Sequence, residues 1–172
     1  MDIADKKRLM YIQSEDFYFL TYNTIILLQE LKCVDGKFLK DYRKIAFLTD
    51  FVSNPYYTSF LKKETYSDKD KNELTRLYSN GILREKEINK LFYSLENRGI
   101  ITLERNSKKD EINISLNSKM ISPDFLDTEL FEVEIRNAKI IKTSINRLIS
   151  LKLESLITKI FIEKGVKIWQ LF

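Results

Sequence analysis

The sequence predicts a mainly α-helical protein with a small β-hairpin, built as a winged-helix core plus a helical C-terminal extension. Most segments carry apolar residues at intervals of three and four, the period of a helix that buries one face. Only four glycines and two prolines occur in 172 residues, which leaves little material for the turns of an all-β fold. Residues 84–116 run as helix, glycine, strand, polar turn and strand, an order typical of the end of a winged helix.

The first third of the chain is expected to form helices joined by short turns. Ser14 is placed to cap a helix whose apolar stripe includes Phe17 and Leu20. Asn54-Pro55 should end the second helix, because the residue before a proline disfavours the helical region. The expected order is a polar lead-in at 1–14, a helix at 14–32, a turn at 34–37, a helix at 38–53, a short helix at 56–63 and a charged loop at 66–71.

The middle of the chain carries the winged-helix pattern. A short helix is expected at 70–79, with Asn80-Gly81 as its stop signal. A second helix at 84–98 has apolar residues at the spacing i, i+3, i+4 and i+7, and Gly99 should end it. The first strand, the polar turn and the second strand follow at 100–104, 106–110 and 112–116. The turn would then be the tip of the wing.

Ser122-Pro123-Asp124 marks a boundary between a helical winged-helix domain at 1–121 and a helical extension at 122–172. From about residue 128 to Gly165 the pattern is helical. Its apolar residues fall on two faces rotated from each other, with Ile141, Ile145, Leu148 and Ile149 on one and Leu153, Leu156, Ile157, Ile160 and Phe161 on the other. The extension is therefore either one helix that bends near Ser150 or two segments that pack on different surfaces.

The residue content argues against an enzyme. The chain has no histidine, so there is no histidine base, nucleophile dyad or metal ligand. Neither a phosphate-binding loop nor a dinucleotide fingerprint occurs, and the acidic residues are scattered among lysines. We therefore expect no catalytic residues, no metal and no cofactor. The single cysteine, Cys33, and the absence of a secretion signal or an apolar run near the ~20 residues of a membrane span favour a cytoplasmic protein.

Two groups of cations are candidate nucleic-acid contacts, in a chain of net charge +4. Lys108 and Lys109 lie at the expected wing tip. A second group has no acidic residue among its members and would share one broad helix face; it consists of Arg136, Lys139, Lys142 and Arg147. The helix at 84–98 is disfavoured for DNA readout, because Glu85, Glu87 and Glu96 accompany its basic residues and would repel phosphates.

A third group is a candidate partner interface. Large rigid aromatics concentrate binding energy, and an apolar chain end is unusual. The candidate residues are Ile157, Ile160, Phe161, Ile168, Trp169 and Phe172. For the terminal aromatic residues, docking on the chain's own core is an equally good interpretation.

The first sixty residues resemble a known family. They contain a Tyr-Asn-rich helix and then a helix that ends in Asp-Phe-Val-Ser-Asn-Pro. The segments that carry this pattern are Tyr22 to Leu31, Leu39 to Ile45 and Leu48 to Pro55. This is similar to the middle components of bacterial ABC-three-component systems, which include the accessory subunit of Lamassu-type antiphage defence. The resemblance implies a winged-helix core, a basic helical C-terminus, and two partners: an SMC- or Rad50-like ATPase and an effector, often a nuclease. It implies no catalytic residue; Asp50, Asn54 and Pro55 correspond only as structural positions.

The resulting hypothesis is a non-catalytic winged-helix accessory subunit that bridges the ATPase and the nuclease in an antiviral defence complex and takes part in DNA sensing. No small-molecule substrate and no membrane are expected among its partners. The alternative is a winged-helix transcriptional regulator, which would show salt-sensitive affinity for one DNA site. A carboxylate metalloenzyme is the third and least favoured hypothesis. The sequence leaves open the partners' identity, the stoichiometry and the trigger of activation.

Overall fold

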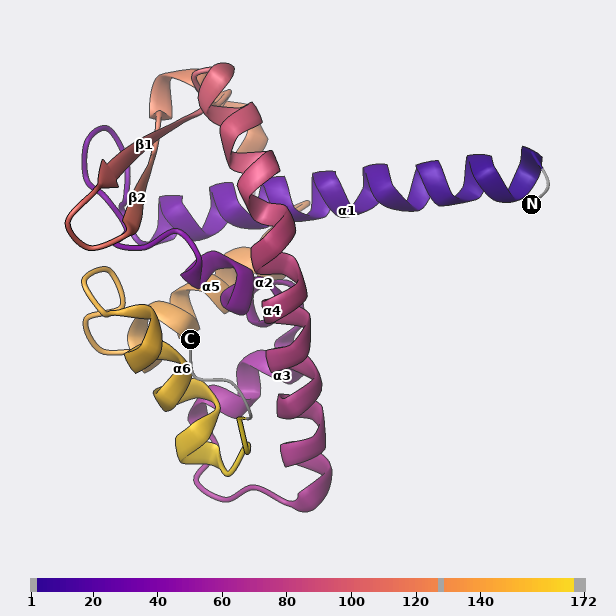
Figure 1. The fold of residues 1–172 in the computed structure, drawn as a ribbon, viewed down its shortest axis with the longest axis vertical. Helices are drawn as coiled ribbons and strands as arrows, with labels where there is room; N and C mark the ends of the chain where they lie inside the picture. The colour runs from indigo at the N-terminus through magenta and orange to yellow at the C-terminus, as the bar shows by residue number, and fades with distance from the viewer. Residues whose placement is uncertain (1–2, 127–128, 169–172) are drawn as a thin grey trace.

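The computed structural model describes residues 3–126 and 129–168, which form a mainly helical fold with one antiparallel β-hairpin (Figure 1). This confirms the predicted mixture of helices and a small hairpin. The α-helices are α1 (Ile3–Glu30), α2 (Lys44–Ser53), α3 (Pro55–Ser59), α4 (Asp68–Asn97), α5 (Glu132–Ser144) and α6 (Leu153–Ile160). The strands are β1 (Ile101–Asn106) and β2 (Glu111–Leu116), and the 3-10 turns are η1 (Phe60–Lys62), η2 (Ser118–Met120), η3 (Pro123–Leu126) and η4 (Ile162–Lys164). Within the described ranges, no helix combines the length and the apolar character that a membrane crossing needs.

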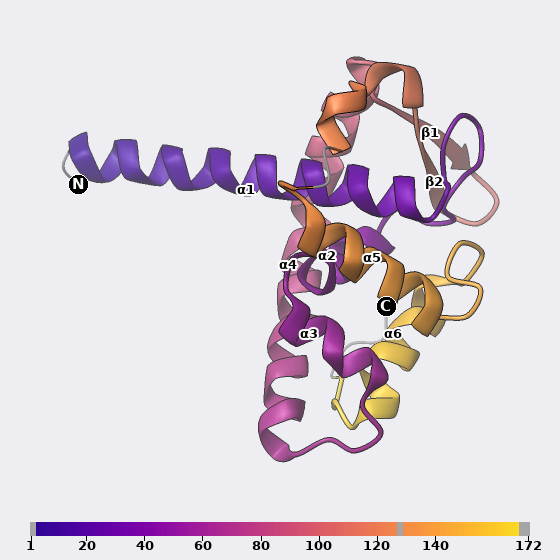
Figure 2. The same cartoon turned by 180° about the vertical axis from the view of Figure 1, so that it is seen from behind.

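Helix α1 is longer than the sequence predicted. The expected polar lead-in at residues 1–14 is wrong for residues 3–14, because the helix already begins at Ile3. Its first half runs clear of the other elements, as both ribbon views show (Figures 1 and 2). Its second half passes through the body, where residues 23–28 are all buried. The helix therefore has a core-forming half and a projecting half.

Helix α2 is shorter than predicted, because the chain before it runs beside the hairpin. The prediction began the helix at Phe38, whereas α2 begins at Lys44. Leu39 and Ile114 exchange both backbone hydrogen bonds, at 2.8 and 3.0 Å. The segment 33–42 thus borders β2 like a short third strand, and its backbone groups are used there instead of in a helix.

Helix α4 is continuous, so the predicted stop at Asn80-Gly81 is wrong. One helix of 30 residues, Asp68–Asn97, replaces the two helices predicted at 70–79 and 84–98. Gly81 is buried against the ring of Phe47 on α2, and a Cβ built on it would lie 2.3 Å from the nearest ring carbon. The glycine therefore permits a close helix contact and does not end the helix. The helix ends at Asn97, before Gly99, which has a φ of 73°.

The hairpin lies as predicted, and each strand has six residues where five were predicted. The register pairs Ile101 with Leu116 and Leu103 with Ile114, and these four side chains are buried. The turn contains Asp110 at a φ of 49°, a left-handed conformation that aspartate tolerates better than most residues.

The C-terminal extension forms two helices, which decides between the two sequence interpretations. A loop at residues 145–152 separates α5 from α6. Ile141 of α5 and Leu156 of α6 belong to the same hydrophobic core as Ile26 of α1 and Phe51 of α2. The predicted domain boundary at residue 121 stays a prediction. The two helices that follow it share one hydrophobic core with the elements that precede it.

Candidate functional site

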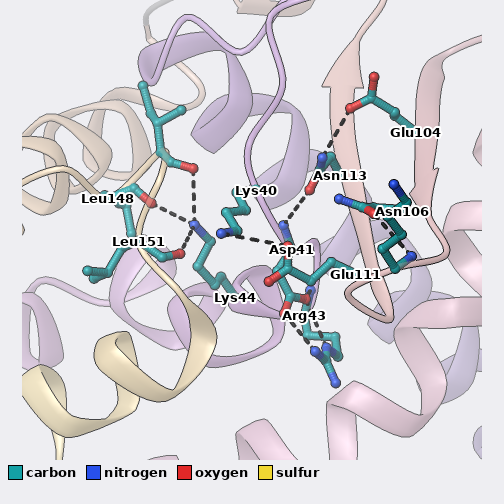
Figure 3. Close-up of polar contacts among 12 residues, drawn as sticks. Lys40, Asp41, Arg43, Lys44, Glu104, Asn106, Glu111, Asn113, Leu148 and Leu151 are labelled. Atoms are coloured by element: carbon teal, nitrogen blue, oxygen red, sulfur yellow. Dashed lines mark hydrogen bonds and ion pairs between the residues drawn. The ribbon is translucent and has the colours of Figure 1, made fainter.

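The loop between α5 and α6 is held by one buried lysine. Lys44, the first residue of α2, is completely buried and donates hydrogen bonds from Nζ to three backbone carbonyls of the loop (Figure 3). The distances are 2.6 Å to Leu148, 3.3 Å to Ile149 and 2.9 Å to Leu151. Burial lowers the pKa of Lys44 to about 8, although the nearby carboxylate of Asp41 favours its charged form. The lysine fixes the loop to the start of α2.

The turn end of the hairpin is attached at the same place. Asp41 has a φ of 57°, and its backbone N–H donates to Asn113 on β2 at 3.1 Å. Its buried carboxylate accepts two hydrogen bonds from the Arg43 guanidinium, at 2.8 and 2.7 Å (Figure 3). This pairing raises the pKa of Arg43, which stays charged in any case. The Nζ atom of Lys40 lies 3.7 Å from the carboxylate of Glu111, the first residue of β2. These contacts connect α2, the hairpin and the loop.

A surface pocket of about 350 Å³ opens where these three segments meet. The ion pair of Asp41 and Arg43 lines it, together with Lys109 of the hairpin turn. The start of α6 contributes Lys152 and Glu154. Lys109 and Lys152 are exposed, and no ion pair within 4.0 Å is found for either among the described residues. They stand beside the three carboxylates that also line the pocket, those of Asp41, Glu111 and Glu154.

The predicted wing-tip lysines are placed as expected. Lys108 and Lys109 lie in the turn between β1 and β2 and are exposed. The hairpin turn and the α5–α6 loop lie on the same side of the molecule in both ribbon views (Figures 1 and 2). The loop carries Arg147, which is exposed and has a φ of 56°. This edge therefore presents cations from two segments that are distant in the sequence; their contact with nucleic acid stays a prediction.

The predicted basic face of the C-terminal helix is only partly formed. Arg136 and Lys139 line one exposed groove on α5, with Glu132 beside them. Lys142 instead donates a hydrogen bond of 2.9 Å to the carbonyl of Glu30, at the end of α1. Arg147 lies beyond the end of α5, so the four residues do not share one helix face.

The predicted partner interface needs a correction. Ile157, Ile160 and Phe161 are 0 to 1% exposed and lie in the chain's own core, because α6 turns its apolar face toward α2 and α4. Ile168 is half-buried and also packs against that core. Trp169 and Phe172 lie outside the described residues. The first three are therefore core residues and are not a surface for a partner.

Several residues of this site were not among the sequence candidates. Asp41, Arg43 and Lys44 fell within a predicted helix, and Lys152 was not among the candidate nucleic-acid contacts. A completely buried lysine has the same sequence signature as an exposed one. Only the pairing of the 33–42 segment with β2 places these residues beneath the hairpin.

Comparisons of the chain with protein-family models, with curated proteins and with solved structures found no match. The function must therefore be argued from the arrangement of the residues themselves.

Proposed function

We propose that this chain is a non-catalytic winged-helix accessory subunit that joins an SMC- or Rad50-like ATPase to an effector nuclease in an antiviral defence complex. The observation that carries the proposal is the projecting half of α1. This half begins the helix and lies clear of the body, and the second half of the same helix continues into the core (Figure 1).

The order of the elements supports a winged-helix core. The elements follow one another in the order of that fold: α1, the strand-like segment at Leu39, α2, α4, β1 and β2. The segment at Leu39 pairs with β2, so the hairpin has a third neighbour on its inner edge. α3 and η1 are then an insertion between the second and third helices of the core.

The projecting helix supports an adaptor role for physical reasons. An isolated helix shorter than about 12–15 residues is marginal in water, and most helices in proteins are stabilised by packing. Residues 3–16 leave the body as a continuation of the core-forming half, so a partner that covers them would be held rigidly relative to the core. Helix-on-helix docking of this kind is a common mode of subunit recognition.

The proposal can be tested by affinity capture from the native host with the full-length chain tagged. The matched pair is Gln13→Pro, which breaks the projecting half, and Gln13→Ala, which preserves it. We expect the wild type and Gln13→Ala to recover an SMC- or Rad50-like ATPase together with a nuclease, and Gln13→Pro to lose both. Circular dichroism melts check that the core of the Pro variant is folded. Recovery of neither partner by the wild type would refute the proposal.

A further inference from the structure

The projecting half of α1 has opposite charges toward its two ends. The basic residues, at positions 6–8, come near its free end, where Asp5 offsets one of their three positive charges. The acidic residues, Glu15 and Asp16, come where the helix meets the body. Residues 9–12 between them are the apolar run Leu-Met-Tyr-Ile. The order along the helix is therefore cationic, apolar and anionic.

The body has a hollow beside the point where α1 leaves it. The helix crosses α4 there, as both ribbon views show (Figures 1 and 2). The hollow has a volume of about 330 Å³, and Leu20 of α1 lines it together with Leu83, Arg84 and Glu87 of α4. Leu83 is 63% exposed, and the Arg84 guanidinium is held by Asp50 at 3.0 Å. Glu87 is exposed, and no ion pair within 4.0 Å is found for it in the described part of the chain. The junction thus offers an uncovered apolar side chain and an additional negative charge.

From this order of charges we infer that two copies of the chain pair through the projecting halves of α1, antiparallel about a two-fold axis near residues 11 and 12. A two-fold contact needs a surface that is complementary to itself. This segment meets that condition, because an antiparallel copy reverses the order of its charges. The cationic end of each helix then faces the anionic end of the other, and the apolar run faces itself. A parallel pair would place like charges side by side, which costs free energy.

The lengths of the helix and the position of the hollow agree with this arrangement. Residues 3–20 span about 27 Å at 1.5 Å per residue. With the axis between residues 11 and 12, positions 7 and 8 of one copy come level with positions 16 and 15 of the other. Ile3 of the second copy comes level with Leu20, beside the hollow, where it would cover Leu83. The contact is short compared with a standard interface, so we expect a dissociation constant in the micromolar range.

This pairing goes beyond the proposed bridging role and does not rest on it. A pair of helices leaves the outward sides of both helices open, so another subunit can still dock on them. Self-association and subunit capture are also measured separately, the first on the purified chain and the second in the native host.

The test is sedimentation equilibrium of the purified full chain over micromolar concentrations, at low and high salt. One test variant is Lys7→Glu with Arg8→Glu, and the other is Glu15→Lys with Asp16→Lys. The matched control is Lys62→Glu with Lys69→Glu, which makes the same change in net charge at two exposed positions on η1 and the start of α4. Circular dichroism checks that each variant keeps the helical content of the wild type.

We expect the wild type and the control to form a dimer reversibly, and more weakly at high salt. Each test variant should associate at least about tenfold more weakly, because the two-fold axis repeats every altered pair. An equimolar mixture of the two test variants should form a dimer again, since each then faces opposite charges. A wild type that stays monomeric, test variants that associate as the wild type does, or a mixture that stays monomeric would overturn the inference. A monomeric chain that still captures the ATPase and the nuclease would overturn the pairing alone, and a dimeric chain that captures neither would overturn only the bridging role.

Discussion

Gly81→Ala should destabilise this protein, although the same change in most helices does the opposite. Alanine in place of a helix-interior glycine normally stabilises by about 0.5–1 kcal/mol. Here the new Cβ would lie 2.3 Å and 2.7 Å from two carbons of the Phe47 ring. Favourable carbon–carbon contacts need about 3.5–4.0 Å, so one partner must move by roughly 1 Å.

The ring has little room to move. Phe47 is 1% exposed and packs on Tyr78 and Phe161, with ring centroids 5.9 and 6.3 Å away. Overpacking a tight core costs roughly 1–3 kcal/mol and occasionally more, and an overlap of this size belongs at the upper end. After the propensity gain is subtracted, we expect a net loss of about 2 kcal/mol.

Urea denaturation followed by far-UV circular dichroism measures this loss. Ser79→Ala, an exposed position two residues earlier in α4, is the control and should change stability by less than about 0.5 kcal/mol. In a Phe47→Leu background the cost of Gly81→Ala should shrink to below about 1 kcal/mol, because the two sites share one contact. A Gly81→Ala protein as stable as the wild type would refute the proposed close packing of α2 and α4.

The remaining predictions concern two buried polar side chains and one helix cap. The folded-state pKa of Lys44 is about 8, below its ordinary value of 10.5, so the unfolded chain binds the extra proton between these values. The free energy of unfolding of the wild type, measured by urea titration relative to that of Lys44→Met, should therefore rise by about 2 kcal/mol from about pH 7.5 to about pH 9.5. A difference between the two proteins that stays constant with pH would contradict the lowered pKa of Lys44. Asn137→Ala removes a hydrogen bond of 2.9 Å to the carbonyl of Val52 and should lower the free energy of unfolding by about 1–3 kcal/mol. Ser67→Ala breaks the capping box with Asp70 and should lower the melting temperature, for a cost of about 1 kcal/mol; an unchanged melting temperature would argue against the cap.

The residues of the candidate site were predictable only where their placement follows from the pattern of neighbouring residues in the sequence. The hairpin turn with Lys108 and Lys109 follows from a strand pattern, because alternation along a few residues is enough to identify it. The burial of Lys44 and the separation of Lys142 from Arg136 depend on which segments meet. Charge counting along α4 also could not show that Glu96 and Glu85 are paired with cations from other elements.

The sequence by itself determined the mainly helical class, the hairpin, and the helix break at Asn54-Pro55, because periodicity, alternation and proline chemistry act within a few residues. The tertiary structure decided that Gly81 is a packing residue and that residues 33–42 border a strand. It also decided that Ile157, Ile160 and Phe161 belong to the core. The physical reason is that a glycine, a lysine or an apolar helix face can be placed at low free energy in several different structural environments. The long-range contact that selects among them is made only when the chain is folded.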